Sequence, residues 1–307
     1  MRSGLSAFAL AAVCACGNLS NEDLAFLEAL PQKDQLHVAV PVAGTSQNLC
    51  TLGAADVWTS AKSTGDDINA GVEGILALVD QIRAVTPTTR DTDSRAWGPF
   101  PDSSHPGYIV QVTMSRELDA QGVPWRWIYD IEERKPPADF LPILEGEFFG
   151  AQARDGIGRI TLHFENTTAL GINKPTDPTF PAQVLYDLSS DPHTVALDLT
   201  NGVTGFGLVG FYYGYAGYAD GHGRFDYTFP DQQSPGCNVQ VTAYFTAQGA
   251  GRATFTVHCP LGLSFGPVTQ CWDVSACIVY ADDPFALTPA CGGVKPCLLG
   301  AQSSCAL

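Results

Sequence analysis

The chain has 307 residues, and its 32 acidic and 16 basic side chains give a formal net charge of −16. Nucleic-acid binding requires a basic patch, so a body this acidic is not expected to bind nucleic acid. Only 16% of the residues are charged, and 31 glycines and 21 prolines supply many turns, as in exported β-rich proteins.

Residues 1–15 have the layout of a secretory signal peptide. Arg2 is followed by an apolar run over residues 5–13, which is shorter than the roughly 20 residues of a membrane-spanning helix. Val13-Cys14-Ala15-Cys16 then resembles the lipobox of bacterial lipoproteins. The resemblance implies cleavage before Cys16, fatty acyl chains (typically palmitate) on that cysteine and, because Gly17 is not aspartate, delivery to the outer membrane.

The lipid on Cys16 would be the link to the membrane. Several acyl chains hold a protein firmly, whereas one holds it only marginally. Removal of Arg2 with the signal changes the net charge from −16 to −17, so anionic headgroups would repel the body. A second register for the motif, residues 10–14, remains open, as do a plain secreted protein and an intracellular chain with an apolar start.

Eight cysteines remain once Cys14 leaves with the signal and Cys16 takes the lipid. An even number in an oxidising compartment predicts up to four disulfides of undetermined pairing. A zinc cluster is the alternative, but the chain has no Cys-x-x-Cys spacing. The disulfide candidates are Cys50, Cys237, Cys259, Cys271, Cys277, Cys291, Cys297 and Cys305.

Two helices and one strand are predicted before residue 87. Ser20 can cap a short leucine-rich helix that Pro31 ends. Residues 35–42 alternate and predict a first strand, and residues 64–86 carry apolar side chains at helical spacing. The following residues 86–107 are predicted as a polar loop.

From residue 108 the apolar pattern has a period of two, and turn residues interrupt it at short intervals. This pattern predicts a mainly β (α+β) fold: an antiparallel meander forming a curved sheet or partial barrel, with the long amphipathic helix packed on it. The order of elements is similar to the half-barrel of lipoprotein carriers of the Lol system, by analogy alone. Predicted strands are 108–116, 124–133, 143–151, 158–165, 182–188, 194–200, 205–218, 223–229, 238–247 and 250–259.

The predicted organisation has four parts. Residues 1–15 form the signal peptide, and residues 16–62 form a lipidated N-terminal segment with a short helix and a strand. Residues 63–280 form the β-meander domain with its packing helix. Residues 281–307 form a cysteine-rich tail.

The glycine- and aromatic-rich stretch 205–218 is the candidate ligand site. Phe206, Phe211, Tyr213 and Tyr215 could line a groove for an apolar ligand, although they could equally be core and rim residues of a bent strand. The Gly-x-Gly-x-x-Gly pattern at 205–210 continues as strand rather than helix, so no dinucleotide cofactor is expected.

Metal and catalytic sites are not predicted. Asp220, His222 and Asp226 lie around an Asp-Gly hairpin turn, which explains them without a metal. Glu145 and Glu147 share one side of a predicted strand, and glycosidases use two carboxylates across a cleft, yet a solvated strand face carries the same residues.

Three functions follow as hypotheses. The first is a non-enzymatic, lipid-anchored extracytoplasmic protein that binds an apolar ligand or a partner protein. The second is an envelope hydrolase acting on glycan or ester bonds. The third is a surface or adhesion module of structural role.

Overall fold

The computed structural model describes residues 19–32, 36–41, 50–83, 85–150, 156–172, 179–204, 207–231, 234, 236–293 and 295–305. The side chains at 67, 71, 74, 75, 77–81, 199–204 and 207–211 lie outside this description. The predicted signal peptide and Cys16 therefore lie outside the described residues, as does Phe206.

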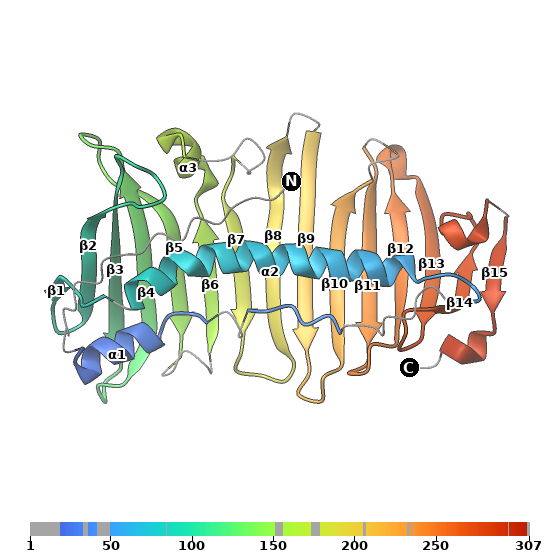
Figure 1. Cartoon of the computed structure of the whole chain (residues 1–307), viewed down its shortest axis with the longest axis horizontal. Helices are drawn as coiled ribbons and strands as arrows, with labels where there is room; N and C mark the ends of the chain where they lie inside the picture. The colour runs from blue at the N-terminus through green and yellow to red at the C-terminus, as the bar shows by residue number, and fades with distance from the viewer. Residues whose placement is uncertain are drawn as a thin grey trace, which may run out of the picture.

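In the described part of the chain, fifteen strands form one antiparallel sheet whose order in space is their order in sequence, and β1 does not pair with β15. The sheet is an open meander (Figure 1), which confirms the prediction of a mainly β, antiparallel meander fold. The strands are β1 (Thr89–Arg90), β2 (Ser94–Pro101), β3 (Ile109–Leu118), β4 (Pro124–Arg134), β5 (Leu141–Phe149), β6 (Ile157–Leu162), β7 (Ala182–Asp187), β8 (His193–Thr204), β9 (Gly207–Gly217), β10 (Gly223–Pro230), β11 (Asn238–Phe245), β12 (Gly251–His258), β13 (Ser264–Trp272), β14 (Ile278–Asp283) and β15 (Cys297–Gly300).

Both ends of the sheet depart from the sequence prediction. The predicted polar loop 86–107 contains β1 and β2, and Trp97 of β2 is fully buried with its Nε1 donating to the Val85 carbonyl at 2.9 Å. At the other end, β14 crosses the predicted boundary at residue 280 and β15 lies in the predicted tail. The tail is thus partly the last portion of the sheet.

Helix α2 (Asp56–Arg83, 28 residues) occupies the region predicted as a helix over 64–86. It begins eight residues earlier and ends three residues earlier than predicted. The helix runs across one face of the sheet, roughly perpendicular to the strands (Figure 1). Ile68, Val72, Leu76 and Ile82 are buried in the core shared with the strands. We call the sheet face that α2 covers the inner face, and the opposite one the outer face.

Helix α1 (Asn21–Glu28) is the predicted short helix and lies on the same face as α2 (Figure 1). Ser20 and Asp23 form a capping box, in which each side chain accepts from the other residue's backbone N–H. Asp23 is fully buried and bonds to Arg95 at 2.7 Å and to Arg90 at 3.0 Å. Burial raises the pKa of Asp23, but hydrogen bonds from the Ser20 backbone and the two guanidinium groups outweigh burial and lower it to about 2.

The strand predicted at 35–42 is wrong for its described residues. Leu36, Val38 and Val40 are buried, but residues 36–41 pair with no strand of the described sheet. Asn69 of α2 satisfies the backbone of Val38 instead, accepting from its N–H at 2.7 Å and donating to its carbonyl at 3.0 Å. The alternation therefore reflects packing of an extended segment against a helix rather than strand pairing.

Aromatic side chains on the inner face lie over glycines of the neighbouring strand. Tyr129 pairs with Gly146, and Tyr186 pairs with Gly158. A Cβ added to Gly146 would lie 1.7 Å from Tyr129 Cζ, so only glycine leaves room for the ring. The sheet thereby accommodates large aromatic rings beneath the two helices.

The eight predicted cysteines pair into four disulfides among the described residues: Cys50–Cys277, Cys237–Cys259, Cys271–Cys305 and Cys291–Cys297. They confirm the disulfide prediction and indicate an oxidising, extracytoplasmic compartment. Cys50–Cys277 ties the segment before α2 to the turn before β14. The other helical elements among the described residues are α3 (Phe164–Leu170), where the predicted strand 158–165 ends early, and the 3-10 turns η3 (Pro260–Gly262), η4 (Pro289–Cys291) and η5 (Gln302–Cys305).

Within the described residues, no helix is both long and apolar enough to cross a membrane.

Candidate functional site

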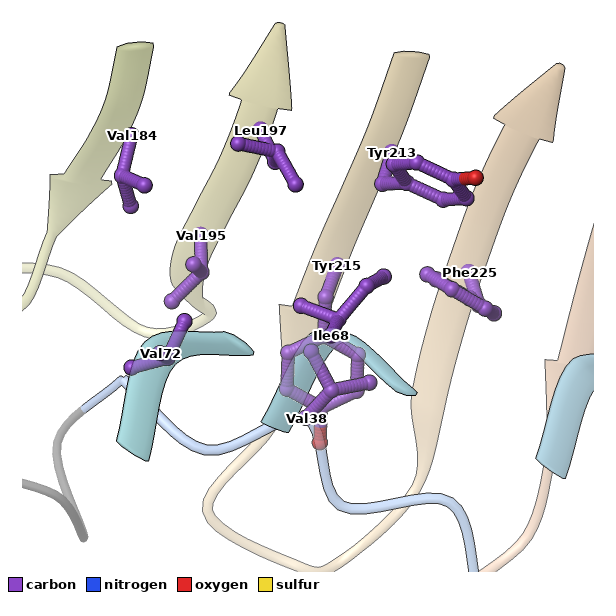
Figure 2. A pocket seen from close by; sticks show the side chains of 9 residues that line it. All are labelled: Val38, Ile68, Val72, Val184, Val195, Leu197, Tyr213, Tyr215 and Phe225. Atoms are coloured by element: carbon purple, nitrogen blue, oxygen red, sulfur yellow. The ribbon is translucent and has the colours of Figure 1, made fainter. Parts of the chain in front are cut away.

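The predicted aromatic site lies on β9 and faces α2. Tyr213 and Tyr215 point into the space between the sheet and α2, next to Phe225 of β10 (Figure 2). Phe211 is on the same strand, but its side chain lies outside the described part, and Phe206 lies outside it altogether. The structure therefore brings together two of the four predicted residues.

This space is filled by protein. The void left between α2, the 36–41 segment and strands β7 to β10 is about 10 Å³, which barely holds one water molecule. Tyr213 stacks near Phe225, with ring centroids 6.5 Å apart, and Tyr215 stacks near Phe245 at the same distance. Burial raises the pKa of Tyr215, and its hydroxyl reaches the Ala39 carbonyl at 3.5 Å. In this conformation, both tyrosines are partly buried and pack against the core beneath the helix.

The outer face carries a larger depression over β4, β5 and β6. Its volume is about 180 Å³, and we call it the outer hollow. Apart from Gly146, the three strands contribute every second residue to it, because side chains alternate between the two faces of a sheet. The lining residues are Arg126, Ile128, Asp130, Glu145, Gly146, Glu147, Arg159 and Thr161.

Glu145 and Glu147 do share one face, as their spacing predicts, but they have different partners. Glu147 lies 2.5 Å from Arg126 and 3.1 Å from Arg159. The bond to Glu147 raises the pKa of Arg126 further above its usual value. Glu147 therefore lies between two guanidinium groups.

The other half of the outer hollow has an excess of negative charge. Partial burial, then repulsion from Glu145 and Glu132, raises the pKa of Asp130. His163 bridges two carboxylates, with its Nε2 at 2.7 Å from Glu145 and its Nδ1 at 2.7 Å from Glu165. Partial burial lowers the pKa of His163, but the bonds to Glu165 and Glu145 outweigh it and raise the pKa overall.

Exposed apolar side chains border the outer hollow on one side. Trp125 is 43% exposed and contacts Phe149, with ring centroids 6.0 Å apart. Ile157 and Leu185 are 52% and 45% exposed. Register places Phe149 beside Arg126 and Ile157, and Leu185 beside Arg159, so these side chains share the outer face. Large exposed apolar groups around a polar depression are a feature of interaction surfaces.

One group of side chains among the described residues has the spacing of a metal site: Asp102, His105 and Glu133. Burial, followed by the neighbouring Asp102 carboxylate, raises the pKa of Glu133 to about 7. Sequence reasoning missed this group, because Glu133 comes from a different strand, and only the Asp-x-x-His spacing of the first two residues is visible. Asp220 and His222 form the predicted hairpin turn, whereas Asp226 pairs with Arg224 and Thr242.

Comparisons with protein-family models, with curated proteins and with solved structures found no match. The likeness to Lol-type carriers therefore stays a prediction from the order of elements, and function is argued from the geometry alone.

Proposed function

We propose that this chain is a non-enzymatic, lipid-anchored extracytoplasmic protein that binds a partner protein through the outer face of β4 to β7. The anchor is the acylated Cys16 in the outer membrane, as the lipobox-like motif implies. The single observation that carries the proposal is the contrast between the two sheet faces. The inner face is packed, whereas the outer face has a hollow of about 180 Å³ with an apolar border.

The packed inner face favours a protein partner over an apolar ligand. A fatty acyl chain needs a cavity far larger than the void of about 10 Å³ beneath α2. The carrier alternative would require α2 to leave the sheet. The buried apolar side chains of α2 oppose that movement, because each large one contributes roughly 1.5–3 kcal/mol of burial; those described include Val57, Trp58, Ile68, Val72, Leu76 and Ile82.

The charge of the outer hollow indicates which side chains the partner protein presents. A cation on the partner would offset the repulsion between Asp130 and Glu145 in the acidic half of the outer hollow. Beside it, Trp125, Phe149 and Ile157 offer apolar contact. A partner with a lysine or arginine flanked by apolar side chains fits both features. Aromatic residues and arginine are the groups that most often dominate such interfaces.

The hydrolase alternative needs a carboxyl pair that is free to exchange protons. Glu147 is occupied by Arg126 and Arg159, and Glu145 bonds to His163. These contacts favour a binding surface over a hydrolytic centre. An adhesion module of purely structural role would need no defined partner at the outer hollow, which separates it from the function proposed.

Site-specific photo-crosslinking in the native envelope tests the proposal. A photoreactive residue at Ile157 should give one defined adduct, and the variants W125A and D130N should remove most of it. Tyr244 provides the matched control, since it is 44% exposed on the outer face, close to the 52% of Ile157, but it lies on β11. Equal adducts at both positions, or none at Ile157, would contradict the proposal. Mass spectrometry of the mature N-terminus tests the lipid on Cys16 separately.

A further inference from the structure

The turn between β2 and β3 brings two metal-ligating side chains against a buried glutamate of β4. His105 Nδ1 lies 2.6 Å from Asp102 Oδ2 and 3.2 Å from Glu133 Oε1. The three ligand atoms all lie within 4.8 Å of one another. A single ion at about 2.0–2.2 Å from each atom would require these side chains to shift around it.

Glu133 provides the second observation. The residue is 1% exposed, and its Oε1 accepts no hydrogen bond among the described residues. In the tautomer with a proton on His105 Nδ1, that proton is directed to Asp102, whose oxygen is the nearer acceptor. A buried carboxylate oxygen without a donor is costly unless a proton or a cation compensates it. Lys135, on the same side, lies over the Tyr108 ring at 5.4 Å rather than on Glu133.

The loop that carries the first two ligands is held in place by its own hydrogen bonds. Asp102 Oδ1 accepts from the Ser104 N–H at 2.7 Å, which leaves Oδ2 directed at His105. Asp102 N–H donates to the Tyr108 carbonyl, and Tyr108 N–H donates to the His105 carbonyl, both at 3.0 Å. The Tyr108 hydroxyl in turn donates to the Leu170 carbonyl at 2.6 Å. Such outer contacts are what orients metal ligands in known sites.

We propose that Asp102, His105 and Glu133 bind one divalent transition-metal ion, with zinc as the best match. One imidazole nitrogen with two carboxylate oxygens suits zinc and its neighbours, whereas calcium and magnesium take oxygen ligands alone. Binding requires the His105 tautomer that carries its proton on Nε2, because Nδ1 must offer its lone pair to the ion. The bound ion joins the β2–β3 loop to β4, and its fourth position stays open to water.

Calorimetric zinc titration of the mature, disulfide-bonded chain after chelator treatment tests the site. We expect one ion per chain, with affinity at least about tenfold weaker in H105N and E133Q. H163N is the matched control, because His163 also contacts two carboxylates, but through opposite ring nitrogens, so they cannot meet at one ion. Its zinc affinity should equal that of the wild type.

Two results would overturn the inference: a wild type that binds no zinc, or H105N and E133Q variants that bind it as the wild type does. Circular dichroism checks that each variant is folded. If E133Q does not fold, D102N and H105N decide the outcome, because both residues are partly exposed. Cobalt substitution gives an independent readout, since the absorption bands of a nitrogen-ligated ion should vanish in H105N.

Discussion

The two faces of the sheet differ in the contacts that their side chains make. On the inner face, strands β4 to β11 place aromatic and aliphatic residues beneath α1 and α2. On the outer face, β4 to β6 carry arginine and carboxylate groups around an open hollow. One alternating sequence thus produces a core on one side and a charged, open surface on the other. Tyr213 and Tyr215, from the stretch predicted as a ligand site, lie on the inner face beneath α2, whereas the open hollow lies on the outer face.

The first prediction compares apolar residues on the two faces. Phe225→Ala should lower the free energy of unfolding by about 4 kcal/mol, because Phe225 is fully buried on the inner face. Ile157→Ala, on the outer face, should change it by no more than about 0.5 kcal/mol. Urea unfolding measures both, and equal losses would contradict the assignment of the faces.

The second prediction concerns the buried ion pair of α1. Asp23→Asn should lower the free energy of unfolding by about 3 kcal/mol at neutral pH, because Arg95 would be left buried without its anion. The ring of Phe26 lies 4.6 Å from the Arg95 guanidinium and meets Trp127 edge-on at 5.2 Å, so loosening of α1 should change tryptophan fluorescence as well. An unchanged urea midpoint would show that α1 does not depend on Asp23.

The pH dependence of the same pair gives a third prediction. Asp23 has a pKa lowered from 3.8 to about 2 in the folded state, so its contribution is fully present above pH 3.8. That contribution is lost as pH falls through the folded value of about 2. The stability gap between the wild type and D23N should therefore narrow over this window. A gap that stays constant would contradict the ion pair as its cause.

The smallest effect is expected for the ion pairs of the outer hollow. Glu147→Gln should lower stability several-fold less than Asp23→Asn, because exposed pairs are screened by water and salt. The comparison uses the same urea titration in low and high salt. A loss as large as that of D23N would mean that the outer hollow stabilises the fold rather than recruiting a partner.

Much of the fold follows from local pattern, but the site does not. Alternation in β3 to β12 predicted the meander, and even cysteine numbers predicted the disulfides without their pairing. The same rule misread residues 36–41, since an extended chain against α2 alternates as a strand does. The outer hollow depends on which strands become neighbours. The partners of Glu147, for example, are Arg126 and Arg159 on the two adjacent strands.

The 205–218 stretch shows what local sequence does not reveal about a candidate site. Its glycines and tyrosines suggested a ligand groove, yet Tyr213 and Tyr215 are covered by α2 and the 36–41 segment. Nothing in the local sequence reveals this cover, which is more than a hundred residues away. Tertiary packing decides whether an aromatic stripe is a site or a core.

Native mass spectrometry of the mature chain lacking Cys16, purified without detergent, tests the central contrast most directly. A packed inner face predicts a mass equal to the chain with four disulfides, with no lipid released on organic extraction. A stoichiometric lipid that survives purification and disappears in a variant with bulkier side chains beneath α2, such as V195F, would contradict the account and restore the carrier function.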